Sequence, residues 1–87
     1  MILEYEERTA EVLKALGHPA RLMIARGLLK KQCNVTKIVA GLNLPQPTVS
    51  QHLKILKNAG VIKGQRKGVK VCYQVEDPVV KKILSCL

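Results

Sequence analysis

The sequence contains very few aromatic residues. It has no Phe and no Trp, and its two tyrosines are Tyr5 and Tyr73. Any hydrophobic core must therefore consist of Leu, Ile, Val and Ala side chains. The 87 residues are enough for one small domain, and a domain of this size buries only about 60–65% of its surface on folding. We therefore expect the chain to gain stability by forming a homo-oligomer.

Acidic residues are also scarce, and they are confined to the two ends of the chain. The stretch from Val12 to Val75 contains no carboxylate, and the whole chain has a formal net charge of +9. Because protein surfaces normally mix both signs of charge, a purely cationic centre predicts a polyanionic partner. The cations of this stretch are Lys14, Arg21, Arg26, Lys30, Lys31, Lys37, Lys54, Lys57, Lys63, Arg66, Lys67 and Lys70.

Nucleic acid fits this charge pattern better than an anionic membrane does. The sequence has no basic amphipathic helix with an aromatic-rich apolar face. It also has no signal peptide and no apolar run near the ~20 residues that a membrane-spanning helix needs. We expect a cytoplasmic protein that binds DNA and has no membrane partner.

The same absences argue against an enzyme. An acid-free centre offers no carboxylate for general acid–base catalysis or for holding Mg²⁺, and no Cys–His spacing indicates a nucleophile. Proteins that bind single strands stack the bases on aromatic side chains, which are rare here. One alternative stays open, a non-sequence-specific nucleic-acid-binding or constitutive architectural protein without its own sensor.

The cysteines Cys33, Cys72 and Cys86 are odd in number, lie far apart and form no CxxC motif. This pattern argues against a disulfide framework and favours a reducing compartment. Three interpretations stay open. The cysteines are small inert side chains, they sense a thiol-reactive or redox signal, or their thiolates hold a metal ion.

The periodicity of apolar residues predicts a mainly α-helical domain with a small β-hairpin. Pro19 suits the first turn of a helix, Asn34 suits the N-cap of another, and Lys67-Gly68 suits a hairpin turn. The expected helices are 4–16, 19–31, a short one after Asn34, 46–58 and 78–87, and the expected strands are 61–66 and 69–75. The order α-α-α-α-β-β-α describes a winged helix-turn-helix domain over 1–87, with the helix-turn-helix at about 34–58 and the wing at about 61–75.

The segment PQPTVSQHLKILK, residues 45–57, is predicted to be the recognition helix. On a helical wheel, Val49, Leu53 and Leu56 form the buried stripe. The opposite face carries uncharged hydrogen-bonding groups, which are the groups that read base edges in the major groove. The expected base-reading residues are Pro47, Thr48, Ser50, Gln51 and Lys54.

A second set of residues is expected to contact the phosphate backbone. The cations of the hairpin cluster around Gly64 and Gly68, where the backbone can approach phosphates closely. Lys37 lies near the third position of its helix, where an acidic residue is usual and a cation is locally unfavourable. A phosphate bound nearby would make this cation favourable. His52 is placed by the wheel at the boundary of the buried stripe. The expected backbone contacts are Lys37, Gln46, His52, Lys63, Arg66, Lys67 and Lys70.

Three segments resemble the ArsR/SmtB family of bacterial winged-helix repressors. They are ALGHPARLMI (15–24), NVTKIVAGLNLPQPTVSQHLKILKNAGVIKGQRKG (34–68) and VCYQVED (71–77), and together they cover nearly the whole chain. The resemblance implies a homodimer joined through the first and last helices, which binds an imperfect inverted repeat in a promoter and is released by an inducer. The interface residues expected from it are Tyr5, Leu13, Val80, Ile83, Leu84 and Leu87.

The resemblance is weaker at the positions that sense the inducer. Asn34-Val35-Thr36 stands where metal-binding members have Cys-Val-Cys, and Val79 stands where others have His after an acid that matches Asp77. No metal site or cofactor is therefore assigned, although a thiolate-bound metal stays open. The positions of Cys33 and Cys86 are loosely similar to those of two cysteines that, in some relatives, form a sulfur bridge between the second and last helices. The nearby Lys30 and Lys31 would favour a thiolate at Cys33.

Overall fold

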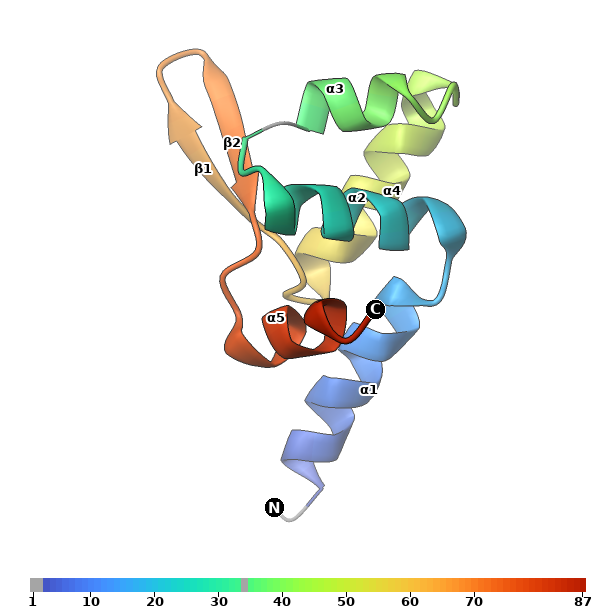
Figure 1. Cartoon of the computed structure of the whole chain (residues 1–87), viewed down its shortest axis with the longest axis vertical. Coiled ribbons are helices and arrows are strands. Elements are labelled where there is room, and N and C mark those ends of the chain that lie inside the picture. The colour runs from blue at the N-terminus through green and yellow to red at the C-terminus, as the bar shows by residue number, and fades with distance from the viewer. Residues whose placement is uncertain (1–2, 34) are drawn as a thin grey trace.

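The computed structural model describes residues 3–33 and 35–87, which form helices and one antiparallel hairpin (Figure 1). The predicted order of elements and the winged helix-turn-helix fold are confirmed. The elements are α1 (Glu4–Leu16), α2 (Pro19–Lys30), α3 (Val35–Ala40), α4 (Gln46–Asn58), β1 (Lys63–Lys67), β2 (Lys70–Gln74) and α5 (Pro78–Ser85). The predicted N-cap Asn34 lies outside the described residues. No helix in the described part of the chain is long and apolar enough to cross a membrane.

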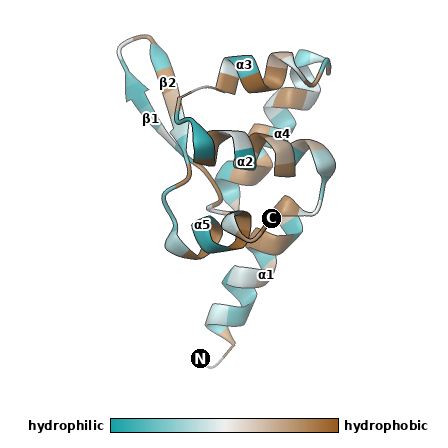
Figure 2. Cartoon of the chain, viewed as in Figure 1, coloured by the Kyte–Doolittle hydropathy of each residue, from teal (hydrophilic) through white to brown (hydrophobic). Residues whose placement is uncertain are grey.

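Helix α2 lies at the centre of the molecule. It packs against α1, α3, α4, α5 and β2, and its side chains Ile24 and Leu28 are fully buried. Leu56 of α4 and Val80 of α5 are also fully buried beside them. Each helix contributes buried apolar residues to this aliphatic core except α3, which packs against it with half-buried ones, while strand β1 is largely hydrophilic (Figure 2).

Two helices begin with a polar cap followed directly by proline. The Nδ1 atom of His18 accepts a hydrogen bond from the N–H of Ala20 at 3.1 Å, before α2. Asp77 Oδ1 accepts from the N–H groups of Val79 at 2.8 Å and Val80 at 3.3 Å, at the start of α5. Since proline has no N–H to leave unpaired, a cap followed by proline fixes where each helix begins.

Gly27 allows α3 to pack closely against α2. A Cβ atom at this position would lie 2.7 Å from Ile38 Cδ1 and 3.0 Å from Ile38 Cγ1. Contacts below 3.0 Å are too short for carbon atoms, so a larger residue would displace Ile38. The glycine therefore leaves room for the Ile38 side chain of α3 against α2.

The wing is shorter than the sequence predicted. Val61 and Ile62 were expected to begin the first strand, but they are buried, at 0% and 3% exposure, because they anchor the hairpin in the core before β1 begins. β1 and β2 pair from Lys63↔Gln74 to Lys67↔Lys70. Gly68 takes a φ of +67°, a left-handed conformation that favours glycine, and allows the two-residue turn.

The apolar residues of the return strand differ in burial along its length. Val69 and Val71 are 95% and 40% exposed, whereas Val75, just after β2, is buried at 3% exposure and Tyr73 packs partly against the core. Cys72, on the opposite face, is buried at 4% exposure. The hairpin extends beyond the body of the protein (Figure 1), so only its base has a core to face, and a period of two cannot show which side of the strand that is.

Candidate DNA-binding surface

Helix α4 begins at Gln46, directly after Pro45, and no side chain caps it. The first backbone hydrogen bond of the helix runs from the N–H of Val49 to the carbonyl of Pro45 at 3.1 Å. Pro47 removes one of the N–H groups that the first turn of a helix leaves unpaired. This end of the helix also contains no acid, so the positive end of its dipole is not compensated by the protein itself.

The predicted face of α4 is exposed. Val49 and Leu56 of the predicted stripe are buried, at 3% and 0% exposure, while Leu53 is only half-buried. The exposed side chains are the ones expected to read bases, namely Pro47, Thr48, Ser50, Gln51 and Lys54. Their position on the free face of α4 makes them accessible to a groove of DNA, and their role as base readers stays a prediction.

The expectation for His52 was wrong, because its side chain lies inside the protein. It is only 8% exposed, and its ring lies 4.6 Å from the ring of His18. Its Nδ1 atom is 3.4 Å from Nη1 of Arg21, whose Nε donates to the carbonyl of Ala15 at 2.6 Å. Burial and, to a lesser degree, the nearby His18 and Arg21 lower the pKa of His52. His52 therefore connects α4 to the start of α2 and cannot contact phosphates. In the sequence, the burial of His52 was indicated by its position at the boundary of the buried stripe on the helical wheel.

The other residues expected to contact phosphates are exposed. The tip of the wing and the first turn of α4 lie at the same end of the molecule, and the N-terminal end of α1 lies at the other (Figure 1). A double helix placed across that end would meet both elements, and no carboxylate between Val12 and Val75 opposes it. The exposed residues are Lys37, Gln46, Lys63, Arg66, Lys67 and Lys70.

A second surface is formed by α1 and α5. Its exposed apolar side chains include Tyr5, Leu13 and Leu87, at 62%, 51% and 63% exposure. Two residues predicted for a dimer interface do not belong to this surface. Val80 and Leu84 are 0% and 3% exposed within a single chain, because the apolar stripe of α5 packs on the chain's own core.

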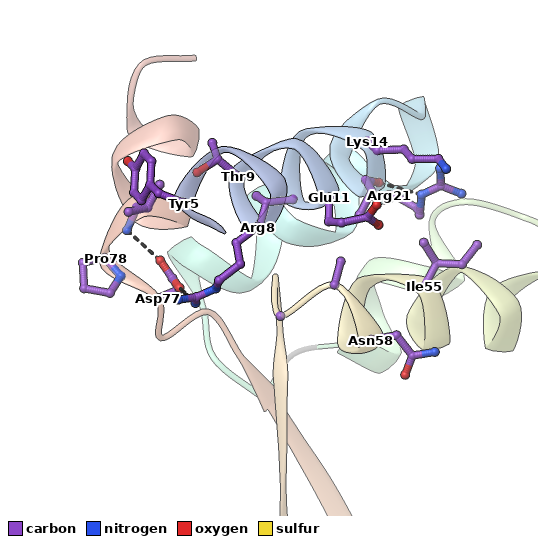
Figure 3. Close-up of a pocket in the computed structure, with 15 residues that line it drawn as sticks. Tyr5, Arg8, Thr9, Glu11, Lys14, Arg21, Ile55, Asn58, Asp77 and Pro78 are labelled. Carbon is purple, nitrogen blue, oxygen red and sulfur yellow. Dashed lines mark hydrogen bonds and ion pairs between the residues drawn. The ribbon is translucent and has the colours of Figure 1, made fainter. Parts of the chain in front are cut away.

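An open depression of about 830 Å³ lies beside this surface, between α1, the end of α4 and the start of α5 (Figure 3). Arg8 reaches across it toward Asp77, with Nη2 3.9 Å from Oδ2. Asp77, which aligns with a metal-binding acid in the resemblance, is thus engaged as a helix cap and in an ion pair. No group of three or more His, Cys, Asp or Glu residues that could hold a metal ion occurs among the described residues.

The expectation that the chain has no disulfide was wrong. Cys33 and Cys72 are bonded to each other, with their Cα atoms 4.3 Å apart. The looser analogy that placed Cys33 near Cys86 was also wrong, since Cys86 is free and exposed near the C-terminus. The two bonded residues are 39 positions apart, and only the return of the wing toward the end of α2 brings them together.

A winged helix-turn-helix with this charge distribution can be compared with known proteins. The model of the family described as bacterial regulatory protein, arsR family, matches residues 18–63, which include α2, α3 and α4. The chain belongs to the arsR family. This result confirms the resemblance seen in the sequence.

Individual members of the arsR family and related regulators match over most of the chain. An uncharacterized HTH-type transcriptional regulator of Methanocaldococcus jannaschii is 44% identical over 85 residues, which cover 95% of this chain and 94% of that protein. The crystal structure of the transcriptional repressor PagR of Bacillus anthracis has a TM-score of 0.82 and 42% identity, with 94% of each chain covered. A homodimeric winged helix-turn-helix DNA-binding domain from Mycobacterium bovis has a TM-score of 0.81 and 26% identity, with 94% of this chain and 76% of that chain covered.

Proposed function

We propose that this chain is a dimeric transcriptional repressor that binds an inverted-repeat operator in the cytoplasm. The observation that carries the proposal is the free face of α4, where Thr48, Ser50 and Gln51 are exposed beside a cationic wing in a region without acids. The similarity to the repressor PagR supports the same function. In this proposal the face of α4 selects the sequence, and the wing cations supply affinity through phosphate contacts.

The second surface supports the dimer. Tyr5, Leu13 and Leu87 leave apolar area exposed on α1 and at the C-terminal end, and Ile83 of α5 is half-buried. The related domain from Mycobacterium bovis is a homodimer. A dimer joined through this surface would have two DNA-binding ends, one from each chain. A two-fold axis between the chains would match the two halves of an inverted repeat.

Binding to a palindromic duplex and to a scrambled duplex of the same composition tests the proposal. The palindrome is first selected from a random pool, and both affinities are then measured at one salt concentration. A repressor prefers its selected site by a factor of about 10³ or more. Equal affinity for both duplexes would favour the non-sequence-specific nucleic-acid binder instead.

The dimer has its own test. Leu13→Glu places a charge in the proposed interface, and Met23→Glu is the matched control, because Leu13 and Met23 are both 51% exposed and Met23 lies on α2. Sedimentation equilibrium should show a monomer for Leu13→Glu and a dimer for the control. A dimer in both variants would place the interface elsewhere.

We also propose that an inducer that opens the Cys33–Cys72 disulfide releases the repressor. The chain has three cysteines, and two of them connect the wing to the turn before α3. Operator binding measured with reduced, oxidised and polysulfide-treated protein, and with Zn²⁺ or As(III), separates the signals. No response to any of these treatments would indicate a constitutive regulator.

A further inference from the structure

The wing is attached to the start of the helix-turn-helix unit at one point. Cys33 lies after the end of α2, and Cys72 lies in the middle of β2. The two are joined by a disulfide, and the N–H of Cys33 also donates to the carbonyl of Tyr73 at 3.1 Å. One covalent bond and one hydrogen bond therefore tie β2 to the turn that leads into α3, while Val61 and Ile62 anchor the base of the hairpin in the core.

The two cysteines of this bridge have different surroundings. Cys33 is exposed, while Cys72 is only 4% exposed. Lys30 and Lys31, which precede Cys33 by two or three positions, are exposed cations. An accessible cysteine beside a second one is the arrangement of redox-sensing pairs, in which one sulfur reacts first and the other closes the bridge.

The backbone at Cys33 also depends on this attachment. Its φ is +63°, in the left-handed region that residues other than glycine adopt infrequently. The bonds from Cys33 to β2 hold it in that conformation. Opening the disulfide removes the covalent restraint and leaves the hydrogen bond to Tyr73 and the packing of β2 on α2, so the turn and the wing gain freedom to move relative to each other.

We propose that Cys33 and Cys72 form a reversible redox switch that fixes the wing to the turn before α3, so that the oxidised protein is the form that binds DNA tightly. The inference rests on the proposed function, since the switch acts on operator binding. In the bridged structure the wing tip and the first turn of α4 lie at the same end of the molecule (Figure 1). A wing that is already positioned loses less conformational freedom on binding, so its phosphate contacts contribute more affinity.

A peroxide supplies the oxidising equivalents. The Cys33 thiolate attacks the O–O bond of the peroxide, gives a sulfenic acid and releases an alcohol, or water in the case of hydrogen peroxide. Cys72 then attacks the Cys33 sulfur, expels water and forms the disulfide. Two thiols lose two electrons and two protons, and one molecule of hydrogen peroxide becomes two of water. A dithiol reductant reverses the reaction by exchange.

A reversible disulfide agrees better with the proposed cytoplasmic location than a permanent disulfide does. In a reducing cytoplasm, disulfides are usually transient and serve catalysis or redox sensing. The exposure of Cys33 gives a small thiol or a peroxide direct access to the pair. The bridge would then open under reducing conditions and close when peroxide rises, without any metal or small-molecule ligand.

The test compares one protein in two redox states. The full chain is oxidised with hydrogen peroxide or reduced with dithiothreitol, and the state of each cysteine is read by alkylation and mass spectrometry. Affinity for the selected palindrome is then measured for wild type, Cys33→Ser, Cys72→Ala and the matched control Cys86→Ser. Oxidation should tighten binding by the wild type and by Cys86→Ser on the order of tenfold, and both bridge variants should bind like the reduced protein in either state.

A second measurement needs no variant. By linkage, a tenfold preference of the operator for the oxidised protein shifts the midpoint potential of the Cys33–Cys72 couple by about 30 mV, and scrambled DNA shifts it less. Equal affinity in the two states, or loss of the response in Cys86→Ser, would overturn the switch and leave the repressor intact. Higher heat stability without a change in affinity would show a structural crosslink only. Equal affinity for palindrome and scrambled duplex in both states would instead remove the proposed function.

Discussion

The imidazole rings of His18 and His52 lie 4.6 Å apart, tilted by 46°. The ring of His18 caps the start of α2, and the ring of His52 lies on the buried side of α4. Because burial and two neighbouring basic groups lower the pKa of His52 from its ordinary value of 6.5, the folded protein favours the neutral ring. The unfolded chain binds that proton more readily.

Stability should therefore decrease in acid. The unfolded state takes up a proton on His52 as the pH falls below about 6.5, while the folded state resists it, so the free energy of unfolding falls with pH in that window. Urea denaturation at pH 7.5 and pH 5.5 measures the difference. In His52→Gln, which cannot be protonated, the dependence between these two values should be smaller than in the wild type, and an unchanged dependence would point to other groups.

Replacing Gln51 should change sequence preference. Its side chain is exposed on the free face of α4, where an amide can both donate to and accept from adenine. Gln51→Ala should cost roughly 1–3 kcal/mol on the best site and relax preference at one base position. A binding assay over all single-base variants of the operator reads this out. Uniform weakening on every sequence would show that Gln51 does not face the bases.

Replacing a wing cation should weaken binding to every duplex alike. Lys67 is exposed next to the hairpin turn and has no carboxylate partner near it in the sequence. Lys67→Ala should reduce the slope of log affinity against log salt by about one unit. Lys82→Ala is the control, since Lys82 is an exposed cation on α5. Equal slopes for wild type and Lys67→Ala would place the wing outside the interface.

The packing of α3 on α2 can be tested at Gly27. In an open helix Gly→Ala stabilises by about 1 kcal/mol, but here the new Cβ would lie 2.7 Å from Ile38 Cδ1. Gly27→Ala alone should therefore lose this gain, because the Ile38 side chain must move away from the new Cβ. Ile38→Val removes the Cδ1 atom. In that background the same change should cost less or even stabilise, and urea denaturation of the four proteins gives the coupling energy. Additive effects would mean that the two residues do not touch.

The disulfide should make a large contribution to stability. Cys33 and Cys72 are 39 positions apart, and a crosslink that closes a loop of this size stabilises a protein by about 4 kcal/mol in the chain-entropy model. Urea denaturation of the oxidised and the reduced wild type measures the value. Cys86→Ser should show the same difference between its two states, whereas Cys33→Ser should show none.

Local patterns predicted the elements well. Pro19, Pro47 and Pro78 mark the first turns of three helices, because proline is favourable there for a reason contained in the residue itself. The free face of α4 also follows from periodicity, since one side of that helix must cover the core.

Features that depend on distant neighbours could not be predicted in this way. Whether His52 is a surface or a core residue depends on the place of His18, and the partner of Cys33 is 39 positions away on another element. The apolar stripe of α5 is visible in the sequence, but the pattern does not tell whether Val80 and Leu84 cover the same chain or a second one. In the structure they cover the same chain.

The central place of α2 limits how this protein can diverge. Ile24, Ala25 and Leu28 are all 0% exposed, and the helix that carries them packs on both the DNA-binding end and the surface formed by α1 and α5. A substitution there would disturb both the proposed DNA-binding end and the proposed dimer surface, whereas a change at the wing tip or on the free face of α4 would alter only the former. New operators and new signals can therefore arise in this architecture by changes at its two ends, while the inner face of α2 is retained.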